Sequence, residues 1–174
     1  MTITRRRLIA ISAALAVLPA VARAGTGTTR LWTGQALGAR ASIRLDHPDA
    51  EAIAARVMAE IDRLEAMLSL YRPESALCRL NRDGHLADPP FELLECLSLA
   101  DAVHRASGGR FDPSVQPLWA LWAEAAAAGR RPDPDAVAET RRRTGWAKVR
   151  LDAAAITLQP GMALTLNGIG QGYV

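Results

Sequence analysis

The chain has few of the residues from which common catalytic and metal sites are built. Its 174 residues include 3 histidines, 2 cysteines and a single lysine, and aromatic residues make up 5%. No histidine or cysteine pair has the spacing of a zinc site, and no Gly-x-Ser-x-Gly motif marks a hydrolase nucleophile. We expect His47 to cap a helix, His85 to lie in a polar loop and His104 to lie near a helix end. The sequence therefore gives no support for a zinc enzyme or a serine hydrolase.

The two cysteines do not by themselves predict a disulfide. Cys78 and Cys96 both lie within apolar patterns of helical period, where a thiol behaves as a small hydrophobic residue. Export to an oxidising compartment would permit a bridge between them. We favour two buried thiols and leave the bridge open.

Only the N-terminus carries a long apolar run. Arg5-Arg6-Arg7 precedes an apolar segment from Leu8 to Val21, and Ala22-Arg23-Ala24 follows it. This segment is short for a bilayer span, and the whole pattern is typical of an export signal of the twin-arginine type. We expect residues 1–24 to be cleaved, so that residues 25–174 are periplasmic and keep no membrane span. A retained membrane anchor is the alternative.

Removal of the signal changes the charge of the protein. The formal net charge is +3, from 21 basic and 18 acidic residues. Four arginines and no acid lie within residues 1–24, so the mature chain has 17 basic and 18 acidic residues and a net charge of −1. A nucleic-acid partner, which calls for a basic surface, is therefore not supported.

Residues 25–174 are predicted to mix helices and strands. Two strands at 30–34 and 39–45 flank a turn near Gly38. A helix follows from Pro48, its expected first helical residue, to about Leu70. Its apolar stripe comprises Ile53, Val57, Ile61, Leu64 and Leu68. A short helical turn carries Leu77 and Leu80, and a second long helix starts near Pro89 and ends at Ser107.

The second half continues the same alternation. A helix is expected at 115–128, with Trp119 and Trp122 in the core, and another at 135–144, where Asp133 and Asp135 serve as turn and capping residues. Strands are expected at 147–151, 156–158 and 163–166, followed by a strand-to-helix turn at 167–174. Because a glycine-rich helix start comes so close to residue 174, we expect the chain to be the N-terminal part of a longer protein.

Two glycine-containing segments are candidates for a binding site. Residues 108–118 hold two glycines and two prolines around one acid, one aromatic residue and one hydroxyl, which is typical of a loop that shapes a pocket. Residues 168–172 follow a Gly-x-Gly-x-Gly pattern that could present its backbone to a phosphate or a cation, or could be an ordinary tight connection. Tyr71, after the first long helix, could stack on a flat ligand or lie at the edge of the core.

Taken in order, these segments resemble the ApbE family, the FAD:protein FMN transferases. The resemblance rests on Ser69-Leu70-Tyr71-Arg72-Pro73-Glu74-Ser75, Leu80-Asn81, Ser107 to Leu118, Leu121-Trp122 and Leu166 to Tyr173. It implies an α+β architecture related to the T-fold, with antiparallel sheet and packed helices. It also implies an Mg²⁺-dependent enzyme that transfers FMN from FAD to a threonine of an acceptor flavoprotein and releases AMP.

The resemblance assigns roles to individual positions. It implies flavin-binding roles for Leu37, Tyr71, Arg110, Phe111, Asp112, Thr165 and Gln171, and a magnesium contact through the backbone oxygen of Gly168. Leu37, Thr165 and Gln171 depart from the residues usual in the family, which are Met, Asp, and Lys or Glu. The form of the 166–173 segment resembles the NosX branch, whose acceptor would be a NosR-like membrane redox protein.

The catalytic residue remains unassigned by the resemblance. It implies that the other magnesium ligands and the catalytic base lie beyond residue 174, so that this chain alone would be inactive. The alternatives are a periplasmic flavin-binding protein without catalysis, a structural or interaction protein, and an FAD pyrophosphatase that releases FMN and AMP.

Overall fold

The computed structural model describes residues 29–174, and the predicted export signal at residues 1–24 lies outside them. The described chain begins with an antiparallel hairpin of β1 (Arg30–Ala36) and β2 (Ala39–Leu45), in which Ala36 pairs with Ala39. The two turn residues, Leu37 and Gly38, both have positive φ, 48° and 78°, as two-residue hairpin turns of type I′ require. The predicted hairpin is confirmed, with β1 two residues longer than expected.

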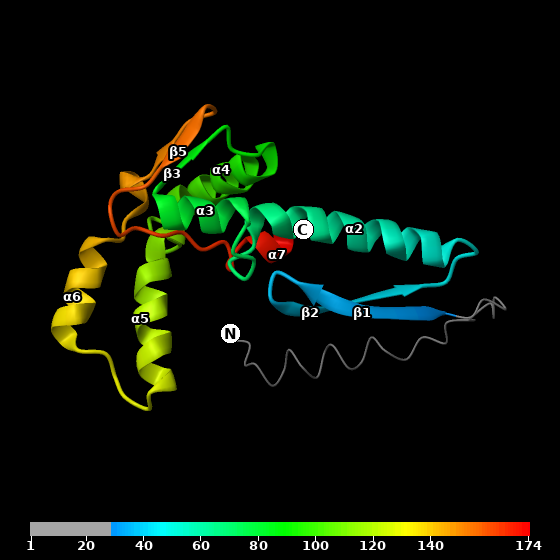
Figure 1. Cartoon of the computed structure of the whole chain (residues 1–174), viewed down its shortest axis with the longest axis horizontal. Helices are drawn as coiled ribbons and strands as arrows, with labels where there is room; N and C mark the ends of the chain where they lie inside the picture. The colour runs from blue at the N-terminus through cyan, green and yellow to red at the C-terminus, as the bar shows by residue number, and fades with distance from the viewer. Residues whose placement is uncertain (1–28) are drawn as a thin grey trace, which may run out of the picture.

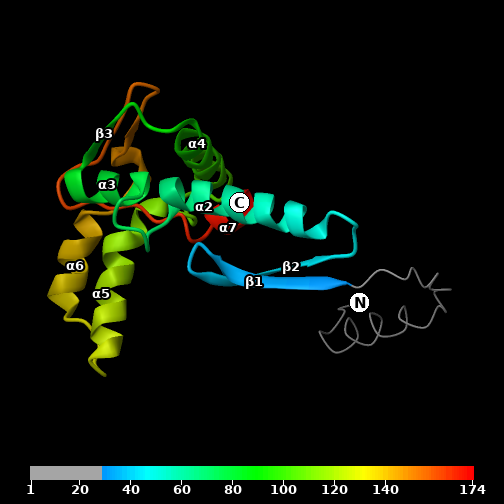
Figure 2. The same ribbon diagram turned by 45° about the vertical axis from the view of Figure 1, so that its right-hand side comes forward.

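Helix α2 (Ala50–Leu68) lies along this hairpin (Figures 1 and 2). It begins after Asp49, so the prediction that Pro48 is its first residue is wrong, and it ends two residues before the predicted Leu70. Leu64 and Leu68 are buried as predicted, but Val57 is exposed. Ile53 and Ile61 are half-buried, and the buried residues of the first half of α2 are the small Ala50 and Ala54.

The main core lies around the next three elements. These are α3 (Ala76–Asp83), β3 (His85–Ala87) and α4 (Phe91–Ala106). Leu77, Leu80, Leu93, Leu97 and Ala100 are fully buried, which confirms both predicted helices and their apolar faces. Cys78 is half-buried on α3 and Cys96 is buried on α4, and both are free thiols.

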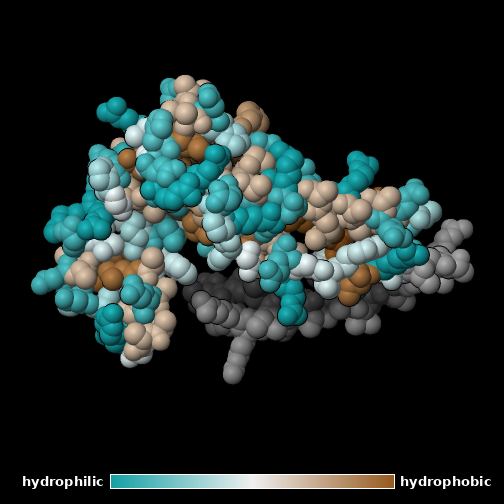
Figure 3. Space-filling model, in the orientation of Figure 1, coloured by the Kyte–Doolittle hydropathy of each residue, from teal (hydrophilic) through white to brown (hydrophobic). Residues whose placement is uncertain are grey.

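A helical pair projects from this core (Figures 1 and 2). It is made of the 3-10 turn η1 (Pro113–Val115), α5 (Gln116–Ala127) and α6 (Pro134–Arg142). Trp119 and Trp122 are 57% and 49% exposed, so their predicted place in the core is wrong. Apart from α6, α5 has little to pack against, and apolar surface gathers on this pair in Figure 3. Asp133 caps α6 by accepting a hydrogen bond from the Asp135 amide, as predicted.

The remaining strands form a small antiparallel sheet of order β3-β5-β4. β4 (Arg150–Leu151) follows the 3-10 turn η2 (Trp146–Lys148), and β5 is Ala155–Thr157. Both strands were predicted, although β4 is shorter than the expected 147–151.

The predicted strand at 163–166 is wrong. Among the described residues this segment pairs with no neighbouring strand. Its backbone bonds instead to the Asn81 side chain, which donates to the Leu164 carbonyl (2.9 Å) and accepts from the Leu164 amide (2.7 Å). The chain then forms α7 (Gly170–Tyr173), which confirms the predicted helix start. Among residues 29–174, no helix combines the length and the apolar character needed to cross a bilayer.

Candidate functional site

The hairpin turn at Leu37 and Gly38 is held from the end of α2. The Leu37 amide donates a hydrogen bond of 2.6 Å to Oε1 of Glu65, and both residues are buried. Leu37 adopts φ of 48°, a conformation that a branched side chain rarely accepts. The hydrogen bond to Glu65 therefore stabilises the unfavourable backbone conformation of Leu37 in this turn.

Tyr71 lies directly against this turn. A Cβ built on Gly38 would lie 2.3 Å from Cε2 of Tyr71, so only glycine permits so close an approach. Tyr71 is nevertheless 60% exposed, and its hydroxyl accepts a 3.4 Å hydrogen bond from Nδ2 of Asn167. An aromatic ring supported by backbone and still open to solvent is suited to contact a flat ligand.

The glycine-containing segment 165–171 joins the turn to the loop at 108–118. A Cβ on Gly168 would lie 3.1 Å from the Phe111 ring, and a Cβ on Gly170 would lie 3.1 Å from Cδ1 of Leu37. The amide of Thr165 donates to the Pro113 carbonyl at 2.8 Å. The fold therefore brings segments of four parts of the chain together around Leu37, Tyr71, Phe111 and Gly168.

Two hollows flank this meeting point. One, of about 470 Å³, is lined by Gln35, Gly38, Glu65, Ser69, Tyr71 and Arg72. The other, of about 290 Å³, includes Leu37 and Gln171 in its lining. A larger hollow of about 830 Å³ lies between α3, α5 and residues 158–163, and none of the predicted site residues lines it.

The Asp112 carboxylate accepts hydrogen bonds from its own loop and from a neighbouring segment. Its Oδ1 accepts from the Ser114 amide (2.8 Å) and the Ser114 hydroxyl (2.6 Å), and its Oδ2 accepts from the Trp146 amide (3.2 Å). The buried Ser114 hydroxyl in turn accepts from the Gly145 amide at 2.6 Å. Asp112 therefore ties the loop to residues 145–146, and its predicted contact with flavin stays a prediction.

The other predicted residues lie at the rim. Arg110 is exposed, and its side chain donates a hydrogen bond to the nearby Ser107 carbonyl. Gln171 is exposed on α7, and the Thr165 hydroxyl accepts from the Asn167 amide at 3.2 Å. His104 pairs through Nδ1 with the Phe111 carbonyl oxygen at 2.7 Å and so supports the loop from α4.

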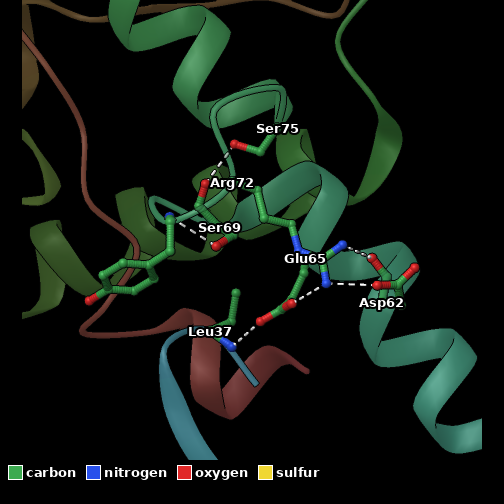
Figure 4. Close-up of polar contacts among 7 residues, drawn as sticks. Leu37, Asp62, Glu65, Ser69, Arg72 and Ser75 are labelled. Atoms are coloured by element: carbon green, nitrogen blue, oxygen red, sulfur yellow. Dashed lines mark hydrogen bonds and ion pairs between the residues drawn. The ribbon is translucent and has the colours of Figure 1, made fainter. Parts of the chain in front are cut away.

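Sequence reasoning missed a polar cluster behind the turn, shown in Figure 4. Arg72 donates to Glu65 at 2.5 Å and to Asp62 at 2.7 Å. The hydrogen bond to Asp62, together with Glu65, raises the pKa of the Arg72 guanidinium. The available signal was the position of Glu65, four residues after Ile61 and three before Leu68, on the buried side of α2.

A magnesium site has little support in the described residues. Between residues 29 and 174, no three His, Cys, Asp or Glu side chains gather closely enough to hold a metal ion. Magnesium prefers oxygen ligands that include carboxylates, and the described residues gather no such group of carboxylates at Gly168. These residues do not make up a complete magnesium site.

The matches to known proteins cover the segments that form this site. The sequence model of the ApbE family matches residues 37–174, which include the turn, Tyr71, the 108–118 loop and the 165–171 segment. The chain is 30% identical over 143 residues to an FAD:protein FMN transferase of Klebsiella pneumoniae strain 342, covering 75% of this chain and 40% of that protein. It is 30% identical over 125 residues to one of Chlamydia pneumoniae, covering 66% of this chain and 39% of that protein.

Solved structures share the fold. The apo flavinyl transferase ApbE of Pseudomonas stutzeri superposes with a TM-score of 0.72 at 24% identity, over 84% of this chain and 49% of that one. The ApbE protein of Thermotoga maritima gives a TM-score of 0.73 at 22% identity, over 84% and 50%. The chain thus spans about 40% of the length of these curated relatives and about half of the solved chains.

Proposed function

The chain belongs to the ApbE family. From this premise we propose that it forms part of an FAD:protein FMN transferase and supplies one wall of the flavin site. The observation that carries the proposal is the convergence of Tyr71, Phe111 and the Leu37–Gly38 turn. These groups come from separate parts of the chain and leave a partly exposed aromatic ring beside two hollows.

The residues of this wall would bind and orient the flavin. An aromatic ring stacked on a flat heterocycle contributes about 1–3 kcal/mol to binding, and Tyr71 is exposed enough to do so. Leu37 and Phe111 would contact the apolar edge of the same ring system. Arg110 and Gln171 would contact the phosphate or ribityl groups of FAD.

The proposed reaction transfers a phosphoryl-linked group. The threonine hydroxyl oxygen of the acceptor bonds to the phosphorus of the FMN part, the bond to the AMP oxygen breaks, and a base takes the hydroxyl proton. No described residue is assigned as that base. The described residues lack a complete magnesium site. We therefore propose that the metal ligands and the base belong to the part of the relatives' sequence that this chain does not cover.

The location and the partner are parts of the same proposal. The twin-arginine pattern at residues 5–7 and the Ala22-Arg23-Ala24 motif support export to the periplasm. The Asn167-Gly168-Ile169-Gly170-Gln171 sequence supports the NosX branch, with a NosR-like membrane redox protein as acceptor. We propose a T-fold relationship for the complete domain.

The test incubates the 174-residue chain, and a version extended to the length of the relatives, with FAD, Mg²⁺ and a threonine-containing acceptor fragment. In-gel flavin fluorescence of the acceptor is expected for the extended version only. Release of free FMN without labelling would instead favour an FAD pyrophosphatase. Binding without either product would favour a flavin-binding protein, and absence of FAD binding would favour a structural role.

A further inference from the structure

We propose that Glu65 is a positioning residue, whose carboxylate holds the Leu37–Gly38 turn against Tyr71 and thereby sets the face on which the flavin stacks. This inference rests on the proposed flavin site. Glu65 is 8% exposed and does not reach solvent as a charged residue on a helix ordinarily does. Its placement on the buried side of α2 calls for an explanation, since burying a carboxylate is costly unless it is paired.

The first carboxylate oxygen stabilises the strained part of the turn. Oε1 accepts the Leu37 amide at 2.6 Å, and Leu37 has a positive φ although it is not glycine. Because the Leu37 side chain is 7% exposed and lies against Gly170, its amide has no ready access to water. Loss of the acceptor would leave a buried N–H unsatisfied.

The second carboxylate oxygen is anchored by Arg72, as Figure 4 shows. Arg72 bonds Oε2 at 2.5 Å and also bonds Asp62 at 2.7 Å. Arg72 follows Tyr71 directly in the chain. One carboxylate therefore links the hairpin turn to the backbone that carries the aromatic ring.

Ser69 completes the positioning of Tyr71 from the same end of α2. Its hydroxyl accepts the Tyr71 amide at 3.1 Å, and its carbonyl accepts the Ser75 hydroxyl at 2.6 Å. Ser69 and Ser75 are both almost completely buried. The ring is thus fixed at its backbone by Ser69, and the surface beneath it, at Gly38, is fixed by Glu65.

The experiment compares Glu65→Ala and Glu65→Gln with two controls. Gln keeps an oxygen for the Leu37 amide but loses the charge that pairs with Arg72. Leu93→Ala removes a fully buried side chain of α4 and lowers stability without removing the hydrogen bond between Glu65 and the Leu37 amide. Glu60→Ala removes an exposed carboxylate of α2 that pairs with Arg63. FMN binding and the fluorescence that remains at saturation are measured for each, together with thermal unfolding.

A second readout does not depend on any ligand. Hydrogen exchange at the Leu37 amide is measured by NMR in the same variants, because this proton is the one that Glu65 accepts. Glu65→Ala is expected to speed its exchange by about tenfold relative to neighbouring strand amides, which corresponds to the loss of about 1.4 kcal/mol of local protection.

The proposal predicts that Glu65→Ala weakens FMN binding by about tenfold or more and raises the residual fluorescence, while Glu65→Gln recovers most of both. Leu93→Ala and Glu60→Ala should leave the residual fluorescence unchanged. If Leu93→Ala with the same loss of thermal stability changes binding as much as Glu65→Ala, the role is only structural and the proposal fails. Unchanged Leu37 exchange in Glu65→Ala also overturns it. If the wild-type chain binds no FMN, the proposed function fails as well, and this outcome is distinct from the others.

Discussion

Replacement of Gly38 by alanine tests two features of this position, its positive φ and its close contact with Tyr71. A Cβ at residue 38 would lie 2.3 Å from Cε2 of Tyr71 and 2.8 Å from both Cδ2 and Cζ. Non-bonded carbon atoms prefer separations of about 3.5–4.0 Å, so the ring would have to move by about 1.2 Å or more. Since Tyr71 is largely exposed, the ring can swing toward solvent instead of unfolding the protein.

The expected stability change is therefore small and the expected binding change is large. Alanine at φ of 78° costs about 1 kcal/mol relative to glycine, which lowers Tm by about 3 °C in a chain of this size. Displacement of Tyr71 removes a stacking contribution of about 1–3 kcal/mol, so FMN affinity should fall by about fivefold to 150-fold.

Gly129→Ala provides the matched control. Gly129 also has positive φ, 67°, but a Cβ there would meet no atom within 4 Å. Both variants carry the backbone cost and only one displaces the ring. Titration of FMN followed by fluorescence quenching, with Tm measured alongside, should show lower affinity for Gly38→Ala alone. Equal affinities for the two variants would refute the stacking role of Tyr71.

Three further predictions concern neighbouring groups. Tyr71→Ala should weaken FMN binding by about tenfold while Tyr71→Phe stays near wild type in a fluorescence titration, and an equal loss in both would show that the ring face is not used. Asp112→Ala should lower the unfolding free energy by about 2–3 kcal/mol in urea, because it leaves Ser114 and the Trp146 amide without their acceptor; a loss below about 0.5 kcal/mol would show that this tie is unimportant. Burial raises the pKa of Cys96 from 9.0 to about 11, so at pH 8 iodoacetamide should label Cys78 well before Cys96 in mass spectra. Because the neutral thiol is the buried form, the stabilising contribution of Cys96 is complete below pH 9 and is lost as pH rises through about 11; prompt labelling of Cys96 at pH 8 would contradict its burial.

The elements with strong local signals were predicted from the sequence. Helix α4 has its apolar residues at regular helical spacing and ends at Ala106, shortly before Gly108, and the hairpin has its turn at Gly38. Each of these signals acts within a few residues, so a single sequence suffices to find it. The ends of α2 were misplaced by two residues, because several residues on each side are compatible with a helix end.

The failures arise where tertiary context overrides the local pattern. Trp119 and Trp122 share a helical stripe that ordinarily indicates burial, but α5 projects from the core and packs mainly on α6. Residues 163–166 have the composition of a strand, yet their backbone bonds to the Asn81 side chain instead of a neighbouring strand. Neither partner can be deduced from the residues nearby in the chain.

The candidate site was also predicted only in part from the sequence. The resemblance pointed to Tyr71, Phe111 and Gly168, and the fold brings their segments together. The contacts that hold the site were not foreseen, because the hydrogen bond from Leu37 to Glu65 joins residues 28 positions apart. A charged residue within the buried side of a helix is the one feature that could have indicated it.

Amide chemical-shift mapping of the 174-residue chain, titrated in parallel with FMN and AMP, tests the flavin site most directly. FMN should perturb the amides of Leu37, Gly38, Tyr71 and Gly168 in a saturable manner, and AMP should perturb them much less. No perturbation by FMN, or perturbation confined to α5 and α6, would contradict the proposal that these residues form a flavin-binding wall.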